Sequence, residues 1–229
     1  MWFRSLIKSL KSRPAVTGGR RSSSRPTSLQ VEALEERAVP AVILDPVGDF
    51  LPTYTGPQQP GMDVVAHEVV VLEDEGRVIF SGQMAGPIAD TQAIGGLYLF
   101  GLDRGQGTPR FLGGTPQIGP NVLWDSLVII NPIGIGRVNN QVAGVVTLLN
   151  PADIHINGNE FTASVPLSLL LPAATRPPQE WTYNLWPRNS TNIGQNAAVS
   201  DLAPDDGNSP FQTIAPARVA SVVVNDGSA

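Results

Sequence analysis

Two aspartates stand close together in the stretch LDPVGDF, near the start of the acidic part of the chain. Asp45 and Asp49 flank a Pro-x-Gly turn. Carboxylates and backbone carbonyls on such a turn suit a hard cation such as calcium, which takes about six to eight oxygen ligands. The alternative is an ordinary Asx-type turn capped by aspartate. Calcium is therefore the candidate cofactor, and the sequence leaves both interpretations open.

The other reactive residue types give little support to catalysis. The chain has no cysteine, which excludes disulfides and thiolate chemistry. Its two histidines, His67 and His155, lie in strand-like stretches, and HEVVV lacks the second histidine of a zinc-binding HExxH helix. No GxSxG motif is present. A pair of loop carboxylates, for instance Asp103 and Asp125, stays open as a glycosidase-like alternative.

Three stretches place aromatic residues beside charged or amide side chains, in YLFGLDRG, NVLWDS and WTYNLWPR. A sugar-binding cleft needs this combination of flat aromatic faces and a few fixed polar groups. We expect Trp186 and Arg188 to be the leading ligand contacts, because a long polar connector follows them. The alternative is that the aromatics fill a core and that Arg104–Asp125 or Arg188–Asp201 are ion pairs that tie loops. The seven candidate ligand-binding residues are Tyr98, Asp103, Arg104, Trp124, Asp125, Trp186 and Arg188.

The chain after residue 40 is patterned as β-strands. Apolar and polar residues alternate in RVIFSGQM, with Val78, Phe80 and Met84 on one face, and EDEG at 73–76 predicts a hairpin turn before it. Pro166 predicts an edge position for the strand within 159–171. No convincing helix interrupts the pattern, so we expect a single all-β, jelly-roll-like β-sandwich of eight or nine strands. The predicted strands are 62–72, 77–84, 96–102, 122–130, 138–149, 159–171, 181–186 and 217–224.

The charges divide the chain into two parts. Residues 1–40 carry eight basic and three acidic residues, whereas residues 41–229 carry seven arginines, no lysine and seventeen acidic residues. An acidic body without lysine is poorly suited to neutralise phosphates, so nucleic acid is not an expected partner. No stretch approaches the ~18 apolar residues of a transmembrane helix. We therefore expect a basic leader at 1–40 and one domain at 41–229.

The leader has its own pattern. MWFRSLIKSLKS is amphipathic and could lie on an anionic membrane surface, and the Ser/Arg/Gly/Pro-rich stretch after it predicts disorder. A conventional signal peptide is not expected, since the apolar h-region is missing. A short helix is expected near VEALEERAVP, with Ser28 as its N-cap. That motif resembles the N-terminal segment of many exported planctomycete proteins, which implies export to the cell envelope or the exterior.

A second resemblance concerns the stretch 44–69. Its DPxGD segment, a tyrosine-containing loop and a Pro-Gly-x-Asp strand are similar to the start of glucodextranase C-terminal-type and family-9-carbohydrate-binding-like sandwich modules. Phe50 departs from that pattern, because a second acidic residue often stands there. The resemblance implies a β-sandwich, a structural calcium near Asp45 and Asp49, and sugar binding. The matching residues are Asp45, Pro46, Gly48, Asp49, Tyr54, Pro60, Gly61 and Asp63.

These patterns together predict an exported protein whose β-sandwich binds a ligand or has a structural role at the cell envelope. Polysaccharide or another envelope component is the expected partner. Two alternatives remain open from the sequence. One is a secreted hydrolase that uses loop carboxylates, and the other is a purely architectural envelope protein without a concave aromatic site.

Overall fold

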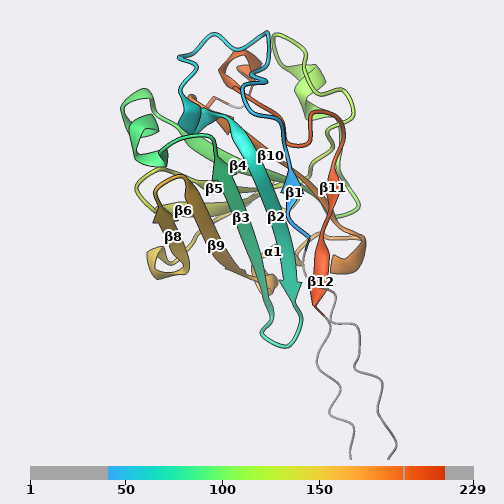
Figure 1. Cartoon of the computed structure of the whole chain (residues 1–229). Coiled ribbons are helices and arrows are strands. Elements are labelled where there is room, and N and C mark those ends of the chain that lie inside the picture. The colour runs from blue at the N-terminus through green and yellow to red at the C-terminus, as the bar shows by residue number, and fades with distance from the viewer. Residues whose placement is uncertain (1–40, 193, 215–229) are drawn as a thin grey trace, which may run out of the picture. The chain divides into compact units, whose positions relative to one another are not determined.

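Two β-sheets pack face to face in the computed structural model, which describes residues 41–192 and 194–214 (Figure 1). The expectation of an all-β, two-sheet sandwich is confirmed. The predicted leader and the predicted strand at 217–224 lie outside the described residues. Among the described residues, no helix is long and apolar enough to cross a membrane.

The first sheet, sheet A, has an antiparallel path of five strands, and a sixth strand joins it in parallel beside β2. Its path runs β1 (Ile43–Leu44), β2 (Val64–Leu72), β3 (Arg77–Met84), β9 (Glu160–Pro166), β8 (Ile154–Asn157), and the added strand is β12 (Gln212–Ile214). The short strands β1 and β12 occupy the same edge of β2, one after the other. The first and last described segments of the domain therefore lie along one strand.

The second sheet, sheet B, is antiparallel throughout. Its order is β11 (Ser209–Pro210), β10 (Thr182–Arg188), β4 (Leu97–Asp103), β5 (Ser126–Ile130), β6 (Gly136–Asn140) and β7 (Val145–Leu148). The helical segments are single turns or short 3₁₀ stretches in the connections. They are Pro60–Met62, Ile88–Ile94, Arg110–Gly113, Pro151–Asp153, α1 (Leu167–Leu170), Pro178–Glu180 and Asn196–Ala198.

The main core lies between the two sheets. Alternate residues of β3 point into it, and Val78, Phe80 and Met84 are fully buried, as the alternation predicts. Phe80 meets Phe100 of β4 with ring centroids 5.1 Å apart. Because both partners are aromatic and come from opposite sheets, this contact ties the two layers together.

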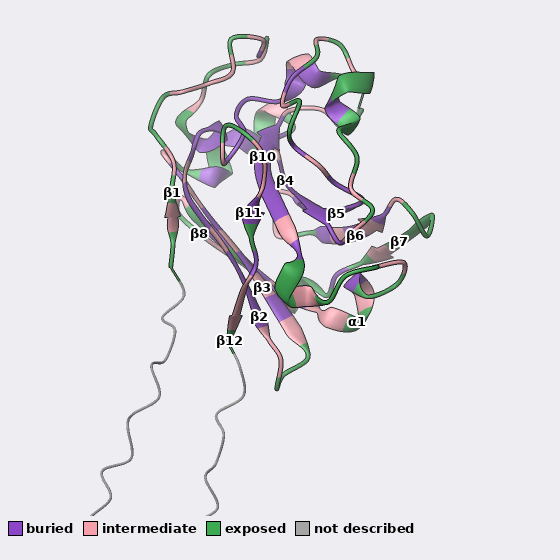
Figure 2. Ribbon diagram, turned by 90° about the vertical axis from the view of Figure 1, so that its right-hand side faces the viewer, coloured by how far each residue is buried: buried purple, intermediate pink, exposed green. Residues whose placement is uncertain are grey.

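A second apolar cluster lies on the other face of sheet B. There, Leu99, Ile129 and Trp186 point away from the main core and are covered by residues of the connecting loops, among them Phe111 and Leu202. Every residue of β5 is buried as a result (Figure 2). This second cluster explains why the sequence of these strands is apolar on both faces.

Four strand predictions need correction. The stretch 138–149, predicted as one strand with Val138, Val142, Val146 and Leu148 on one face, is two strands, β6 and β7, joined by a turn at 141–144. Val138 is buried, whereas the other three side chains are exposed. The strand predicted at 122–130 begins at Ser126. Strand β9 ends at Pro166, where α1 begins, and it lies between β3 and β8 rather than at an edge. The stretch between the strands predicted at 138–149 and 159–171, where no strand is predicted, contains β8.

Candidate metal centre

The loop after β1 positions the first two carboxylates of a candidate cation site. The N–H of Asp45 donates to the carbonyl of Val65 at 3.0 Å, which places Asp45 beside the start of β2. Gly48 then adopts a left-handed φ of +85°, and its N–H donates to Asp63 Oδ2 at 2.8 Å. Glycine takes this conformation at little cost, so the chain can turn tightly and bring Asp49 back towards Asp45.

The other two carboxylates come from distant parts of the sequence. Asp63 immediately precedes β2, and Asp201 lies in the segment that follows β10. Asp201 is held by the N–H groups of Val64 and Leu202, at 2.9 and 2.7 Å. One oxygen from each of Asp45, Asp49 and Asp201 lies within 4.8 Å of the others. Opposite ligands of one calcium ion at about 2.3–2.6 Å are separated by a similar distance, so the set fits that ion.

Three of these four carboxylates have oxygens that are shielded from solvent and lack a hydrogen-bond donor. Asp63 is 2% exposed and Asp201 is 0% exposed. Four of their oxygens are shielded from solvent and accept no hydrogen bond: Asp45 Oδ2, both oxygens of Asp49, and Asp63 Oδ1. The described ion pairs of the domain involve Arg77, Arg104 and Arg176, and none of them reaches this cluster. Buried oxygens without a donor are unusual and indicate a missing partner.

The electrostatics of the cluster lead to the same conclusion. Burial, followed by repulsion from Asp49, raises the pKa of Asp45 to about 7. Burial also raises the pKa of Asp201 to about 8, although two backbone N–H groups oppose the shift. The pKa values of Asp49 and Asp63 are raised as well, mainly by burial. Acids crowded in this way hold protons near neutral pH unless a cation neutralises them.

The sequence identified half of this cluster. Asp45 and Asp49 were predicted as ligands from their spacing, and the structure brings them together with two further acids. Asp63 was visible only as part of the resemblance to sandwich modules. One alternative left open by the sequence pairs Asp201 with Arg188, but its oxygens accept from Val64 and Leu202 instead. No local signal marks Asp201, because only the fold brings it next to the loop after β1.

The predicted aromatic ligand residues are all buried. Trp124 and Trp186 pack against each other, with ring centroids 5.9 Å apart, inside the outer cluster of sheet B. Tyr98 is fully buried in the main core, and its hydroxyl donates to the carbonyl of Gly61 at 2.7 Å. Their faces are covered by neighbouring side chains. This placement favours the alternative that the aromatics fill the core.

The predicted polar ligand residues are also enclosed. Arg104 and Asp125 form a fully buried ion pair, with Nε and Oδ1 2.6 Å apart. Asp125 Oδ2 also accepts from the N–H groups of Arg104 and Gln106. Asp103 Oδ1 accepts from the N–H groups of Gly105 and Gly107. The two acids are therefore committed to tying a loop and do not face each other across an open cleft.

Arg188 lies at the end of β10 and is nearly fully buried. It donates to the carbonyls of Asn192 and Gln195, which wraps the following loop around it. Burial lowers the pKa of the guanidinium to about 10. The structure therefore gives Arg188 a role in holding this loop.

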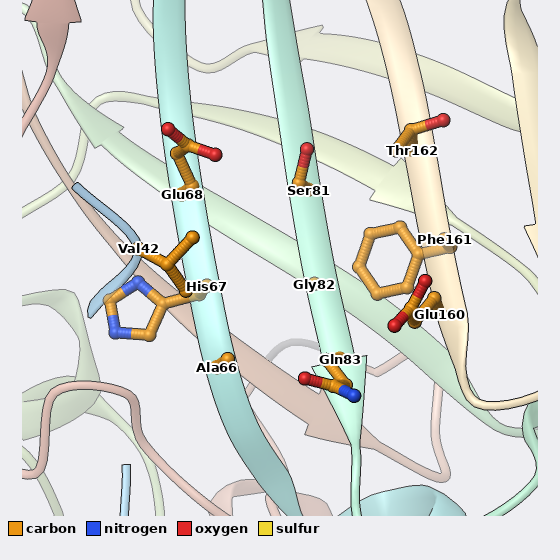
Figure 3. Close-up of a pocket in the computed structure, with 10 residues that line it drawn as sticks. All are labelled: Val42, Ala66, His67, Glu68, Ser81, Gly82, Gln83, Glu160, Phe161 and Thr162. Atoms are coloured by element: carbon orange, nitrogen blue, oxygen red, sulfur yellow. The ribbon is translucent and has the colours of Figure 1, made fainter. Parts of the chain in front are cut away.

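A shallow pocket of about 250 Å³ lies over the outer face of sheet A (Figure 3). Glu68, Ser81 and Thr162 stand in one row across β2, β3 and β9, with Gln83 and Glu160 in the next row. Burial raises the pKa of Glu68, and its Oε1 accepts no hydrogen bond. No lysine or arginine lines the pocket. Its polar groups can therefore accept hydrogen bonds from hydroxyl or ammonium groups.

Comparison with protein-family models, with curated proteins and with solved structures found no match to this chain. The fold and the carboxylate cluster are therefore the observations that bear on function. The described aromatic side chains add little to them, because every described tryptophan and tyrosine is buried.

Proposed function

We propose that this chain is an exported, non-catalytic protein whose β-sandwich is stabilised by a calcium ion bound at Asp45, Asp49 and Asp201, with Asp63 beside them. Its role is structural or ligand-binding, at the cell envelope or outside the cell. The observation that carries the proposal is the convergence of four carboxylates, three of which hold shielded oxygens without a donor, with no basic partner among the described residues. Neutralising this charge needs a cation from solution or bound protons.

Calcium fits this cluster better than the other common divalent ions. All the candidate ligands are carboxylate oxygens, which hard cations prefer, whereas zinc sites rely mainly on histidine nitrogen and cysteine sulfur. Magnesium demands nearly ideal octahedral geometry and gives up its water reluctantly. A loop site with mixed burial is more compatible with the flexible coordination of calcium. Extracellular modules bind calcium with dissociation constants of about 10⁻⁴–10⁻³ M, which suits an exported protein.

The enzymatic alternative has little support in the described residues. Its candidate acids, Asp103 and Asp125, are fixed by backbone N–H groups and, for Asp125, by Arg104. A glycosidase needs two carboxyl groups on either side of a substrate bond in an accessible cleft. The export part of the proposal depends on the resemblance of VEALEERAVP to exported leaders.

Carbohydrate binding is a second candidate function, and the pocket over sheet A is the observation that favours it. Its hydroxyl, amide and carboxylate groups come from three adjacent strands, and Glu68 Oε1 has no donor. A glycan screen followed by titration of the full chain tests this candidate. Loss of binding in Gln83→Ala, with binding retained in Trp186→Phe, would locate the ligand at the pocket. The opposite pattern would favour the aromatic residues predicted from the sequence.

Thermal unfolding of the full chain, in excess EGTA and in about 5 mM calcium, tests the metal proposal. A ligand that binds only the folded state raises the unfolding temperature by mass action. We expect a rise of several degrees with calcium and a smaller one with magnesium. An unfolding temperature that is the same in EGTA and in calcium would contradict the proposal.

A further inference from the structure

The N-terminal arm, which we define as residues 41–49, contributes half of the carboxylate cluster but is poorly anchored otherwise. None of its nine residues is buried, and Figure 2 colours the arm as exposed or intermediate throughout. Val42, Leu44 and Val47 are 55, 79 and 72% exposed. The arm therefore gains little from apolar burial, which is the usual source of attachment for a strand.

The polar contacts of the arm are few. Strand β1 pairs with β2 over only two residues. Asp45 and Gly48 each donate one N–H to the body of the domain. Ala41 and the side chain of Gln212 donate to each other across the ends of the domain. Each such hydrogen bond contributes only about 0.5–1.5 kcal/mol net, and exposed ones contribute less.

The three partly covered residues of the arm are Ile43, Asp45 and Asp49. Two of these are the carboxylates that face Asp63 and Asp201 on the body. Without a cation, every ionised acid in the cluster repels the others, and Asp205 adds to the repulsion on Asp45 and Asp49. With a cation, the same acids bind one ion from both sides. The sign of the interaction between arm and body therefore depends on whether the cation is bound.

We infer that cation binding is the latch that docks the N-terminal arm onto the sandwich. This inference rests on the proposed calcium site and assigns it a regulatory role. The calcium-bound protein holds β1 against β2, and the calcium-free protein releases the arm while the two-sheet body stays folded. Release leaves the edge of β2 at Ala66 and His67 without its partner strand.

Hydrogen–deuterium exchange of the full chain, in EGTA and in about 5 mM calcium, tests this inference. Amides of residues 41–49, including the hydrogen-bonded N–H groups of Asp45 and Gly48, should exchange about tenfold or more slowly with calcium. Amides of β4 and β10 should exchange at equal rates in both conditions. In Asp49→Asn, the arm should exchange rapidly even with calcium. The matched control Asp74→Asn, at an exposed turn position, should behave as the wild type.

A calcium titration of the same sample separates the two proposals. If calcium binds but slows exchange uniformly, or leaves the arm unchanged, the latch is wrong and the calcium site stands. If calcium does not bind, both proposals fall. If calcium binds and slows the arm selectively, the latch is supported.

Discussion

Two loop regions of the same sandwich bury carboxylates, and they do so with different partners. Asp125 and Asp201 are equally buried, each at 0% exposure, and each accepts hydrogen bonds from two backbone N–H groups. Asp125 also faces the guanidinium of Arg104 at 2.6 Å. Asp201 instead faces Asp45 and Asp49.

The difference shows what makes a buried acidic site complete. At Asp125 the chain supplies its own cation, Arg104, which neutralises the carboxylate within the protein. At Asp201 the backbone supplies the same number of donors, but the neighbouring side chains add negative charge. A cation or protons must then come from solution. Burial alone therefore does not distinguish a structural acid from a candidate ligand, whereas the charge of the neighbours does.

The largest effect should come from breaking the buried ion pair of Arg104 and Asp125, which we call the closed pair. We expect Arg104→Ala to destabilise the protein by about 3–5 kcal/mol, because it leaves Asp125 buried without its partner. Calcium should not restore this loss, since the two sites are independent. Urea unfolding in EGTA and in calcium measures both effects. Arg110→Ala, an exposed arginine, is the matched control, and an equally small loss in both variants would contradict the closed-pair account.

A smaller effect is expected from removing one acid of the open cluster. Asp49→Asn should lose about 1–2 kcal/mol of calcium-dependent stabilisation at ~5 mM calcium, if the dissociation constant is in the range of extracellular modules. In EGTA the variant should be as stable as the wild type or more stable, since one like charge is gone. Thermal unfolding in both conditions measures this reversal. A variant that is equally destabilised in EGTA and in calcium would show that Asp49 serves only the turn.

The raised pKa values predict that the metal-free protein loses stability as the pH rises. Asp45 and Asp201 have folded-state pKa values of about 7 and 8, above the ordinary 3.8, so the folded state holds protons that the unfolded state releases. Their stabilising contribution is complete below about pH 4 and is lost as pH rises through 7 to 8. Unfolding temperatures in EGTA should therefore fall more steeply between pH 5 and 9 for the wild type than for Asp201→Asn. Equal slopes would contradict this prediction.

The smallest effect concerns the turn that aims the two loop acids. Gly48→Ala should cost about 1 kcal/mol, because alanine disfavours a φ of +85° although nothing lies within 4 Å of its Cβ. Calcium affinity should fall with it, since Asp49 depends on this turn. Gly113→Ala is the control, because its site is also open and its φ is not left-handed. Equal stability of the two variants would show that the turn is not constrained.

The sequence predicted those features that depend on neighbouring residues. The alternation in β3 is local, and it correctly predicts a strand with one inward face. The spacing of Asp45 and Asp49 is also local, and it correctly predicts two acids on one loop. Asp201 could not be predicted, because the fold alone brings it to Asp45. The environments of Trp124 and Trp186 could not be predicted either. A tryptophan beside a charged residue has the same local sequence in a sugar-binding cleft and in a second core.

The turn at 141–144 shows a further limit. Val138, Val142 and Val146 all stand at even-numbered positions, on both sides of the turn. The alternation therefore predicts one continuous strand, although the chain reverses there. Edge strand β7 has no covering layer, and its apolar residues remain exposed. Periodicity predicts the side chains that could share a face, but the packing of the sheets decides whether that face is covered.

The most direct test of the central claim is a crystal structure of the full chain grown in millimolar calcium, with anomalous diffraction used to identify the ion. We predict one anomalous peak between Asp45, Asp49 and Asp201, with oxygen distances of about 2.3–2.6 Å. The account would be contradicted if no peak lies among these aspartates at that calcium concentration and the protonated side chains contact each other instead.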